Sequence, residues 1–225
     1  IAIFIFQVLK WHKNQTVKRA VYVGLIGGLI VLIRPVNLLI FLFPLLYQVT
    51  TFASFGEKIK LFIKNWKHLF IIGGCAFLII LPQLIYWKYI TGNWFFNSYV
   101  GEGFFFGNNH ILEGLFSYRK GWLVYTPIML LSLVGIFILF KKNKPLFLPL
   151  LCFSTINIFV LYSWWSWWYG GGFGSRPMID TYALMAIPLA GLIDLVRKKT
   201  WSFSPIILLV CTCLFLNVFQ SIQKR

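Results

Sequence analysis

Long apolar runs alternate with short polar segments along the whole chain. Most runs approach the roughly 20 residues that a helix needs to cross a bilayer. The pattern predicts an all-α, polytopic transmembrane helical protein with about seven spans plus a partial one at Ile1 to Leu9, folded as a single transmembrane domain over residues 1–225. The predicted spans are residues 20–33, 38–53, 69–87, 122–140, 146–163, 182–196 and 205–221.

The first residues resemble the end of a span whose beginning is missing. Ile1 lies inside an apolar run, and no initiator methionine precedes it. We therefore expect the chain to be the C-terminal part of a longer protein. Composition agrees with a lipid environment, because 59% hydrophobic residues, 12% charged residues and a mean hydropathy of +0.79 leave too little polar surface for a soluble globule.

The basic residues behind the formal net charge of +16 are concentrated in some of the segments that connect the predicted spans. Alternate connecting segments carry fourteen basic side chains in one set and seven in the other. An excess of lysine and arginine marks the cytoplasmic side, which accounts for the charge without a nucleic-acid partner. The richer set is Lys10, Lys13, Lys18, Arg19, Lys58, Lys60, Lys64, Lys67, Lys141, Lys142, Lys144, Arg197, Lys198 and Lys199. The other is Arg34, Lys88, Arg119, Lys120, Arg176, Lys224 and Arg225.

The first two complete spans are short and are joined by Arg34-Pro35-Val36-Asn37. Proline ends or kinks a helix, and an arginine at such a break must reach water or a partner. Two interpretations stay open: Arg34 snorkels from a tight outer turn, or it lines a polar cavity and helps to hold an anion.

Nothing in the sequence indicates a metal or another cofactor. Cys75, Cys152, Cys211 and Cys213 all lie in apolar runs, and none has a metal-binding spacing with histidine. We expect no cofactor.

The external loop at residues 164–181 is the most informative segment. With the two residues that precede the loop, the sequence as far as Asp180 is YSWWSWWYGGGFGSRPMID. Aromatic side chains with a polar edge favour the membrane boundary, glycines let the backbone approach a bulky ligand, and arginine can grip a phosphate with two hydrogen bonds. We interpret it as a lipid-phosphate site, with anchoring and packing as the alternative. The candidate substrate-binding residues are Trp164, Trp165, Trp167, Trp168, Tyr169, Arg176 and Asp180.

A second external loop, residues 88–121, mixes aromatic pairs with charged side chains. We expect a short amphipathic helix with flanking loops on the membrane surface. Arg119 and Lys120 stand just before the next span and are candidates to bind a phosphate, although plain interfacial anchoring explains them equally well. His110 is a weaker candidate for acid or base chemistry, because a lone loop histidine is more often a bystander.

Two short motifs resemble the C-type (GT-C) glycosyltransferase superfamily, which includes the protein mannosyltransferases and the aminoarabinose transferases. One is the glycine-rich span running into Arg-Pro, here Gly24, Gly27 and Gly28 followed by Arg34-Pro35. The other is a late external arginine before a span with proline and small residues, here Arg176 and then Pro188-Leu189-Ala190-Gly191. The residue after that arginine is Pro177, where many relatives have an aromatic.

The resemblance implies a transferase that moves a sugar from a polyprenyl-phosphate carrier to a glycan, lipid or protein acceptor on the outer face of a bacterial inner (plasma) membrane. It gives Arg176 the role of holding the carrier phosphate. It places the catalytic aspartate in the first external loop, upstream of this chain. Two alternatives remain: an O-antigen ligase or polymerase, or a transporter or flippase of lipid-linked sugars. A coupled carrier is disfavoured because the interiors of spans 69–87 and 122–140 lack ionisable residues.

Overall fold

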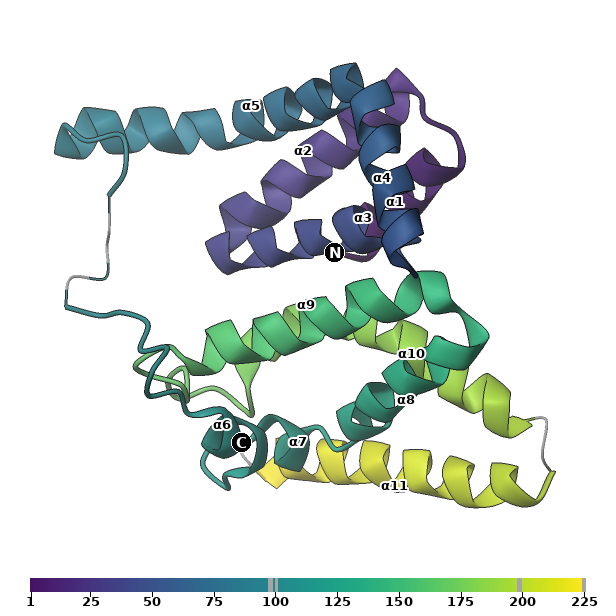
Figure 1. Ribbon diagram of the computed structural model, residues 1–225. Coiled ribbons are helices and arrows are strands. Elements are labelled where there is room, and N and C mark those ends of the chain that lie inside the picture. Colours follow the sequence, from purple (N-terminus) through teal and green to yellow (C-terminus); the bar gives the residue numbers. More distant parts are fainter. Residues whose placement is uncertain (97–98, 100, 198–199, 224–225) are drawn as a thin grey trace. The chain divides into compact units, whose positions relative to one another are not determined.

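The computed structural model describes residues 1–96, 99, 101–197 and 200–223. Lys198, Lys199, Lys224 and Arg225 of the charge count lie outside these residues. Every regular element in the described part of the chain is a helix, so the predicted all-α class is confirmed. The chain divides into two compact units, Ile1–Glu102 (unit 1) and Gly103–Arg225 (unit 2), which are described separately (Figure 1).

Unit 1 is organised around the close packing of α2 on α5 (Figure 1). A Cβ at Gly24 would lie 2.5 Å from the carbonyl oxygen of Ile72, and one at Gly28 would lie 2.8 Å from Cα of Ala76. Glycines four residues apart let two apolar helices approach in this way. The helices of unit 1 are α1 (Ala2–Lys13), α2 (Val17–Ile33), the 3-10 helix η1 (Pro35–Phe41), α3 (Leu42–Leu46), α4 (Phe52–Lys64) and α5 (Trp66–Thr91).

In unit 2, α8 and α10 pack side by side and point the same way (Figure 1). Near their starts, Thr126 and Tyr182 share a hydrogen bond of 3.0 Å between their hydroxyls. Near their ends, Lys142 donates to Asp194 at 2.8 Å. The helices of unit 2 are α6 (Ile111–Phe116), α7 (Trp122–Tyr125), α8 (Ile128–Lys142), α9 (Lys144–Tyr162), the 3-10 helix η2 (Arg176–Thr181), α10 (Tyr182–Arg197) and α11 (Thr200–Gln223).

Among the described residues, four helices are long and apolar enough to cross a membrane, and they coincide with four predicted spans. They cover Trp66–Thr91, Lys144–Tyr162, Arg176–Arg197 and Pro205–Ile222. The predicted count of about seven spans is not supported. The remaining predicted spans fall on helices that are shorter or interrupted.

Proline explains two of the interruptions. A residue that precedes proline is pushed out of the helical region. Arg34 accordingly takes φ −148° and ψ 112°, and α2 ends at Ile33. Thr126, before Pro127, takes φ −140° and ψ 66° and separates α7 from α8 inside predicted span 122–140. The predicted break at Arg34-Pro35 is therefore confirmed, whereas the break at Thr126 went unrecognised.

Predicted span 38–53 is wrong in a different way. The apolar run is divided between η1 and α3, and helix ends at Leu46. Gln48 takes a positive φ of 70°, which turns the chain before a new helix begins after Thr51. This helix, α4, occupies a stretch that the hydropathy pattern treats as a basic connecting segment.

Candidate functional site

The two predicted external loops meet in unit 2 and form one structure. The amide of Phe105 donates to the Ser163 carbonyl at 2.6 Å, and that of His110 donates to the Tyr162 carbonyl at 2.8 Å. In the other direction, the amide of Trp165 donates to the Gly103 carbonyl at 3.0 Å. These bonds flank an isolated antiparallel bridge between Phe104 and Trp164, whose rings make an edge contact at 4.9 Å.

A buried tyrosine at the end of α9 anchors this junction. Tyr162 is fully buried, and α6 packs on its ring so closely that a Cβ at Gly114 would overlap it. The Tyr162 hydroxyl donates to Oγ of Ser175 at 2.9 Å. Ser175 directly precedes Arg176, so one side chain ties the first loop, the end of α9 and the start of η2 together. The short helix expected within residues 88–121 is present as α6.

The tryptophans of the second loop form a connected aromatic cluster. Trp168 contacts Trp165 and Trp167 edge to face, with ring centroids 6.1 and 5.9 Å apart. Trp167 is buried, whereas Trp165 is 42% exposed. The cluster is therefore buried on the side of Trp167 and accessible on the side of Trp165. The predicted residues Trp164, Trp165, Trp167 and Trp168 all belong to this junction.

Arg119 from the first loop completes the cluster. Its guanidinium carbon lies 3.9 Å from the ring centroid of Trp168, which is the geometry of a cation stacked on an aromatic face. Arg119 remains exposed. A guanidinium stacked in this way keeps its edge donors available for an anion in the plane of the fork.

Arg176 begins η2 on the same loop and is also exposed. Its Cδ lies 3.6 Å from the position of a Cβ at Gly172, so the aliphatic part of the side chain runs past that glycine. A Cβ added at Gly170 or Gly171 would have no other atom within 4 Å, and Gly170 takes φ 76°. Gly170 and Gly171 thus leave open space in the same glycine run that the Arg176 side chain passes at Gly172.

His110 and Glu113, two side chains capable of acid–base chemistry, lie beside the aromatic cluster. The sequence alone did not predict this position for them. The imidazole of His110 lies 6.1 Å from the Trp167 ring, centroid to centroid. Its Nδ1 lies 3.7 Å from Oε1 of Glu113, which is one helical turn away. The spacing of three residues across the start of α6 was the available signal.

The remaining predicted residues have different surroundings. Lys120 is 6% exposed, so it belongs to the interior of unit 2 and not to the accessible surface that carries Arg119. Tyr169 turns the chain with φ 50° and donates from its hydroxyl to the Leu161 carbonyl at 2.7 Å. Asp180 is half-buried in η2. Arg34 is a half-buried residue of unit 1, so the site is built here from unit 2 alone.

No group of three His, Cys, Asp or Glu side chains that could hold a metal ion occurs within the described ranges. Unit 1 contains a cavity of about 220 Å³ between α1, α2, α5 and the segments that join them. Its lining is almost wholly apolar and includes His12 and Trp11. It offers room for hydrocarbon but no cationic group for a phosphate.

The junction in unit 2 carries the exposed Arg119 on an aromatic face and the exposed Arg176 beside a glycine turn. Each guanidinium can hold an oxyanion through charge-assisted hydrogen bonds, and apolar or sugar surfaces can lie on the tryptophans. No protein-family model, curated protein or solved structure matches the chain.

Proposed function

We propose that this chain is part of a membrane glycosyltransferase, similar in layout to the GT-C superfamily, that takes a sugar from a polyprenyl-phosphate carrier. The acceptor is an envelope glycan, lipid or protein at the outer face of a bacterial plasma membrane. The junction of the two loops binds the donor, with Arg119 and Arg176 on the carrier phosphate and Trp165 and Trp168 beside the sugar or the first prenyl units.

The stack of Arg119 on Trp168 is the observation that carries the proposal. It joins a cation from one loop to an aromatic face from the other, so the two halves of a donor site come from segments far apart in sequence. Interfacial anchoring alone requires tryptophans at the membrane surface but no cation ordered on one of them.

In the proposed reaction, the acceptor oxygen forms a bond to the anomeric carbon of the sugar. The bond from that carbon to the carrier phosphate oxygen breaks, and its electron pair leaves with the phosphate. A base takes the proton of the acceptor hydroxyl. The two arginines stabilise the negative charge that grows on the departing phosphate.

The parallel packing of α8 and α10 supports the proposed placement in the membrane. If α10 crosses from outside to inside, α8 runs beside it in the same sense, with α7 and the break at Thr126 at the outer end. The salt bridge of Lys142 with Asp194 then lies at the cytoplasmic end. This arrangement supports an outer location for the loop junction, in agreement with the distribution of basic residues.

The test measures sugar transfer from a labelled polyprenyl-phosphate donor by the full-length protein in liposomes. Arg176→Ala and Arg119→Ala should each cost about 2 to 4 kcal/mol of transition-state stabilisation, or roughly thirty-fold to nearly a thousand-fold in turnover. Arg176→Lys should recover only part of the activity, because an ammonium keeps the charge and loses the fork.

Arg197→Ala is the matched control, since Arg197 is an exposed arginine at the opposite end of the helix that follows Arg176. Its turnover should equal that of the unaltered protein. Full turnover and donor affinity in both Arg119→Ala and Arg176→Ala would show that the junction is only an anchor.

A further inference from the structure

The side chains of the amphipathic helix α4 lie on three faces of the helix. With about 3.6 residues per turn, Phe52, Phe55, Ile59 and Ile63 fall on one face of the helix. Lys60, Lys64 and Glu57 fall on a second face, and Lys58, Leu61 and Phe62 on the third. Each face meets different surroundings in the structure.

The third face attaches α4 to the rest of unit 1. Lys58 is 5% exposed, and its Nζ donates to the Tyr47 carbonyl at 2.8 Å and contacts Nε2 of His12 at 2.5 Å. The Phe62 ring stacks on Trp11 with centroids 6.3 Å apart. These contacts fix the rotation of α4 about its own axis.

Because that rotation is fixed, the apolar face points away from the protein. Phe52 is 98% exposed and Ile63 is 66% exposed, and Phe55 and Ile59 are exposed as well. Four large apolar side chains thus form an exposed ridge along the helix, which the protein covers least at its two ends. A soluble surface seldom carries such a patch unless a partner covers it.

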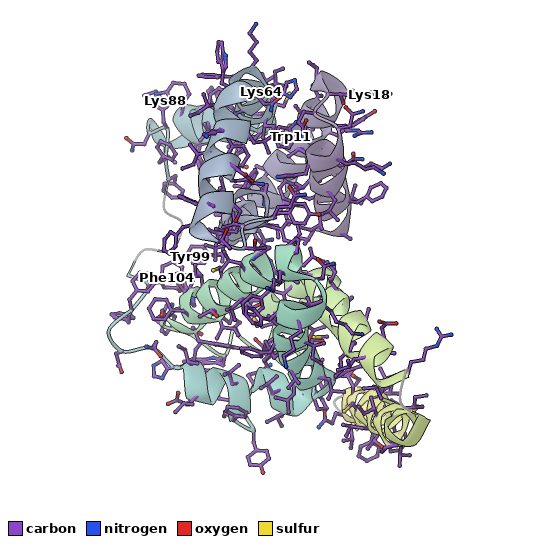
Figure 2. The ribbon with its side chains drawn as sticks, turned by 45° about the vertical axis from the view of Figure 1, so that its right-hand side comes forward. Trp11, Lys18, Lys64, Lys88, Tyr99 and Phe104 are labelled. Atoms are coloured by element: carbon purple, nitrogen blue, oxygen red, sulfur yellow. The ribbon has the colours of Figure 1, made fainter. Side chains whose placement is uncertain are left out.

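The covalent connection to α5 puts this ridge next to the start of a candidate membrane-spanning helix. Only Asn65 separates α4 from α5, a helix of 26 residues that is apolar enough to cross the bilayer. At Asn65 the chain changes direction, and α4 runs across the direction of α5 (Figure 1). Trp11 lies among the helices of unit 1, whereas Lys64 lies at its edge, next to the start of α5 (Figure 2).

The charged face suits an anionic surface. Lys60 and Lys64 are exposed beside the ridge, and Lys67 follows at the start of α5, whereas Glu57 is the one acidic residue from Phe52 to Lys67. Lysines along the edge of an apolar ridge can reach the phosphates of a leaflet while the ridge enters its acyl region.

We propose that α4 lies in the plane of the membrane, with the ridge of Phe52, Phe55, Ile59 and Ile63 inserted among the acyl chains of the cytoplasmic leaflet and with Lys60 and Lys64 on the headgroups of anionic phospholipids. The helix then fixes how deeply α5 is inserted in the bilayer. Through the contacts of Lys58 and Phe62 it also fixes the depth of the rest of unit 1. This inference does not depend on the proposed glycosyltransferase activity.

The experiment measures the depth of single nitroxide labels by electron paramagnetic resonance. The full chain, with its native cysteines replaced, carries one label at Phe55, Ile59, Ile63, Glu57 or Lys60 in vesicles of phosphatidylcholine and phosphatidylglycerol. Labels at the three ridge positions should collide with oxygen and lie roughly 5 to 10 Å below the headgroups. Labels at Glu57 and Lys60 should collide with a water-soluble nickel chelate.

The role of anionic lipid is tested with the label at Ile59. Lys60→Gln combined with Lys64→Gln should make that label shallower, and pure phosphatidylcholine should have the same effect. The matched control is Lys13→Gln combined with Lys18→Gln, which removes the same charge from exposed sites elsewhere in unit 1 and should leave the depth unchanged. Equal depth in the Lys60/Lys64 variant and the unaltered chain would overturn the anionic-lipid contact.

Two other outcomes overturn the membrane placement itself. Nickel access at all five labelled positions would mean that α4 is solvated. Ridge labels that are shielded from both reagents and show spin–spin broadening would mean that a second copy of the chain covers the ridge.

Discussion

Gly114 is the position at which a single methyl group should do most damage to the loop junction. A Cβ there would overlap three atoms of the Tyr162 ring. Tyr162 cannot move aside easily, because it is fully buried and its hydroxyl is bonded to Ser175 at 2.9 Å. Gly114→Ala should therefore push α6 away from the end of α9.

The magnitude follows from the cost of overpacking. Extra carbon in a well-packed interior costs about 1 to 3 kcal/mol. For a chain of this size each kcal/mol lowers the unfolding temperature by about 2 to 4 °C, so the expected decrease is roughly 2 to 12 °C. Displacement of α6 also draws the Arg119 segment away from Trp168, so donor binding should weaken with stability.

The assay is thermal unfolding of the detergent-solubilised protein, followed by tryptophan fluorescence. Gly107→Ala is the matched control, because Gly107 lies in the same loop. A Cβ added there would have no atom within 4 Å, and the residue does not have a positive φ. It should leave the unfolding temperature unchanged. If Gly114→Ala unfolds at the same temperature as Gly107→Ala, the packing of α6 on Tyr162 is wrong.

Two further predictions concern pH and topology. Burial, followed by the charge of Lys58, lowers the pKa of His12 from 6.5 to about 4, so the unfolded chain binds the extra proton between these values. The free energy of unfolding should fall as the pH drops from 6.5 towards 4, and His12→Asn should flatten that slope in thermal scans; an unchanged slope would contradict the buried, neutral imidazole. For topology, single cysteines at Asn109 and Gly172 should react with an impermeant thiol reagent from outside and one at Asn143 should not. Labelling at Asn143 with protection at the other two sites would reverse the orientation.

Hydropathy alone was sufficient to predict the four long helices. The prediction of residues 69–87, for example, falls inside Trp66–Thr91, because an uninterrupted apolar run has no alternative to helix in lipid. It failed where a run of the same hydropathy contains local backbone constraints. Pro127 removes the residue before it from the helix, and Gln48 turns the chain at a positive φ, which a window average does not register.

The amphipathic helix α4 was missed for a related reason. Its residues are too polar on average to be taken as a span, so the hydropathy pattern assigns them to a connecting segment. The signal was present at short range: Thr51 and Ser54 form a reciprocal capping box, and apolar residues recur at the helical period from Phe52 to Ile63.

The candidate site was predictable in its parts and not in its assembly. The sequence alone marked the tryptophans, Arg119 and Arg176, because each is an unusual residue type for its segment. The contact of Arg119 with Trp168 depends on how the end of α9 meets α6, and no periodic pattern connects two loops that are separated by the three helices α7, α8 and α9.

The glycines show how structure changes the weight of a motif. Gly24 and Gly28 contributed to the family resemblance, yet their Cα atoms face α5 so closely that helix packing accounts for them without any shared function. Gly170 and Gly171 face open space, so packing does not account for them; the φ of 76° explains Gly170, whereas no backbone constraint explains Gly171. The glycine run therefore adds to the argument for a ligand only through the open space at Gly171, and a substitution that fills this space without disturbing the fold should affect donor binding before stability. Gly171→Ala provides that test, because Gly171 has no positive φ to strain. Unchanged donor affinity in that variant would remove the glycine run from the site and leave Arg119 on Trp168 to carry it alone.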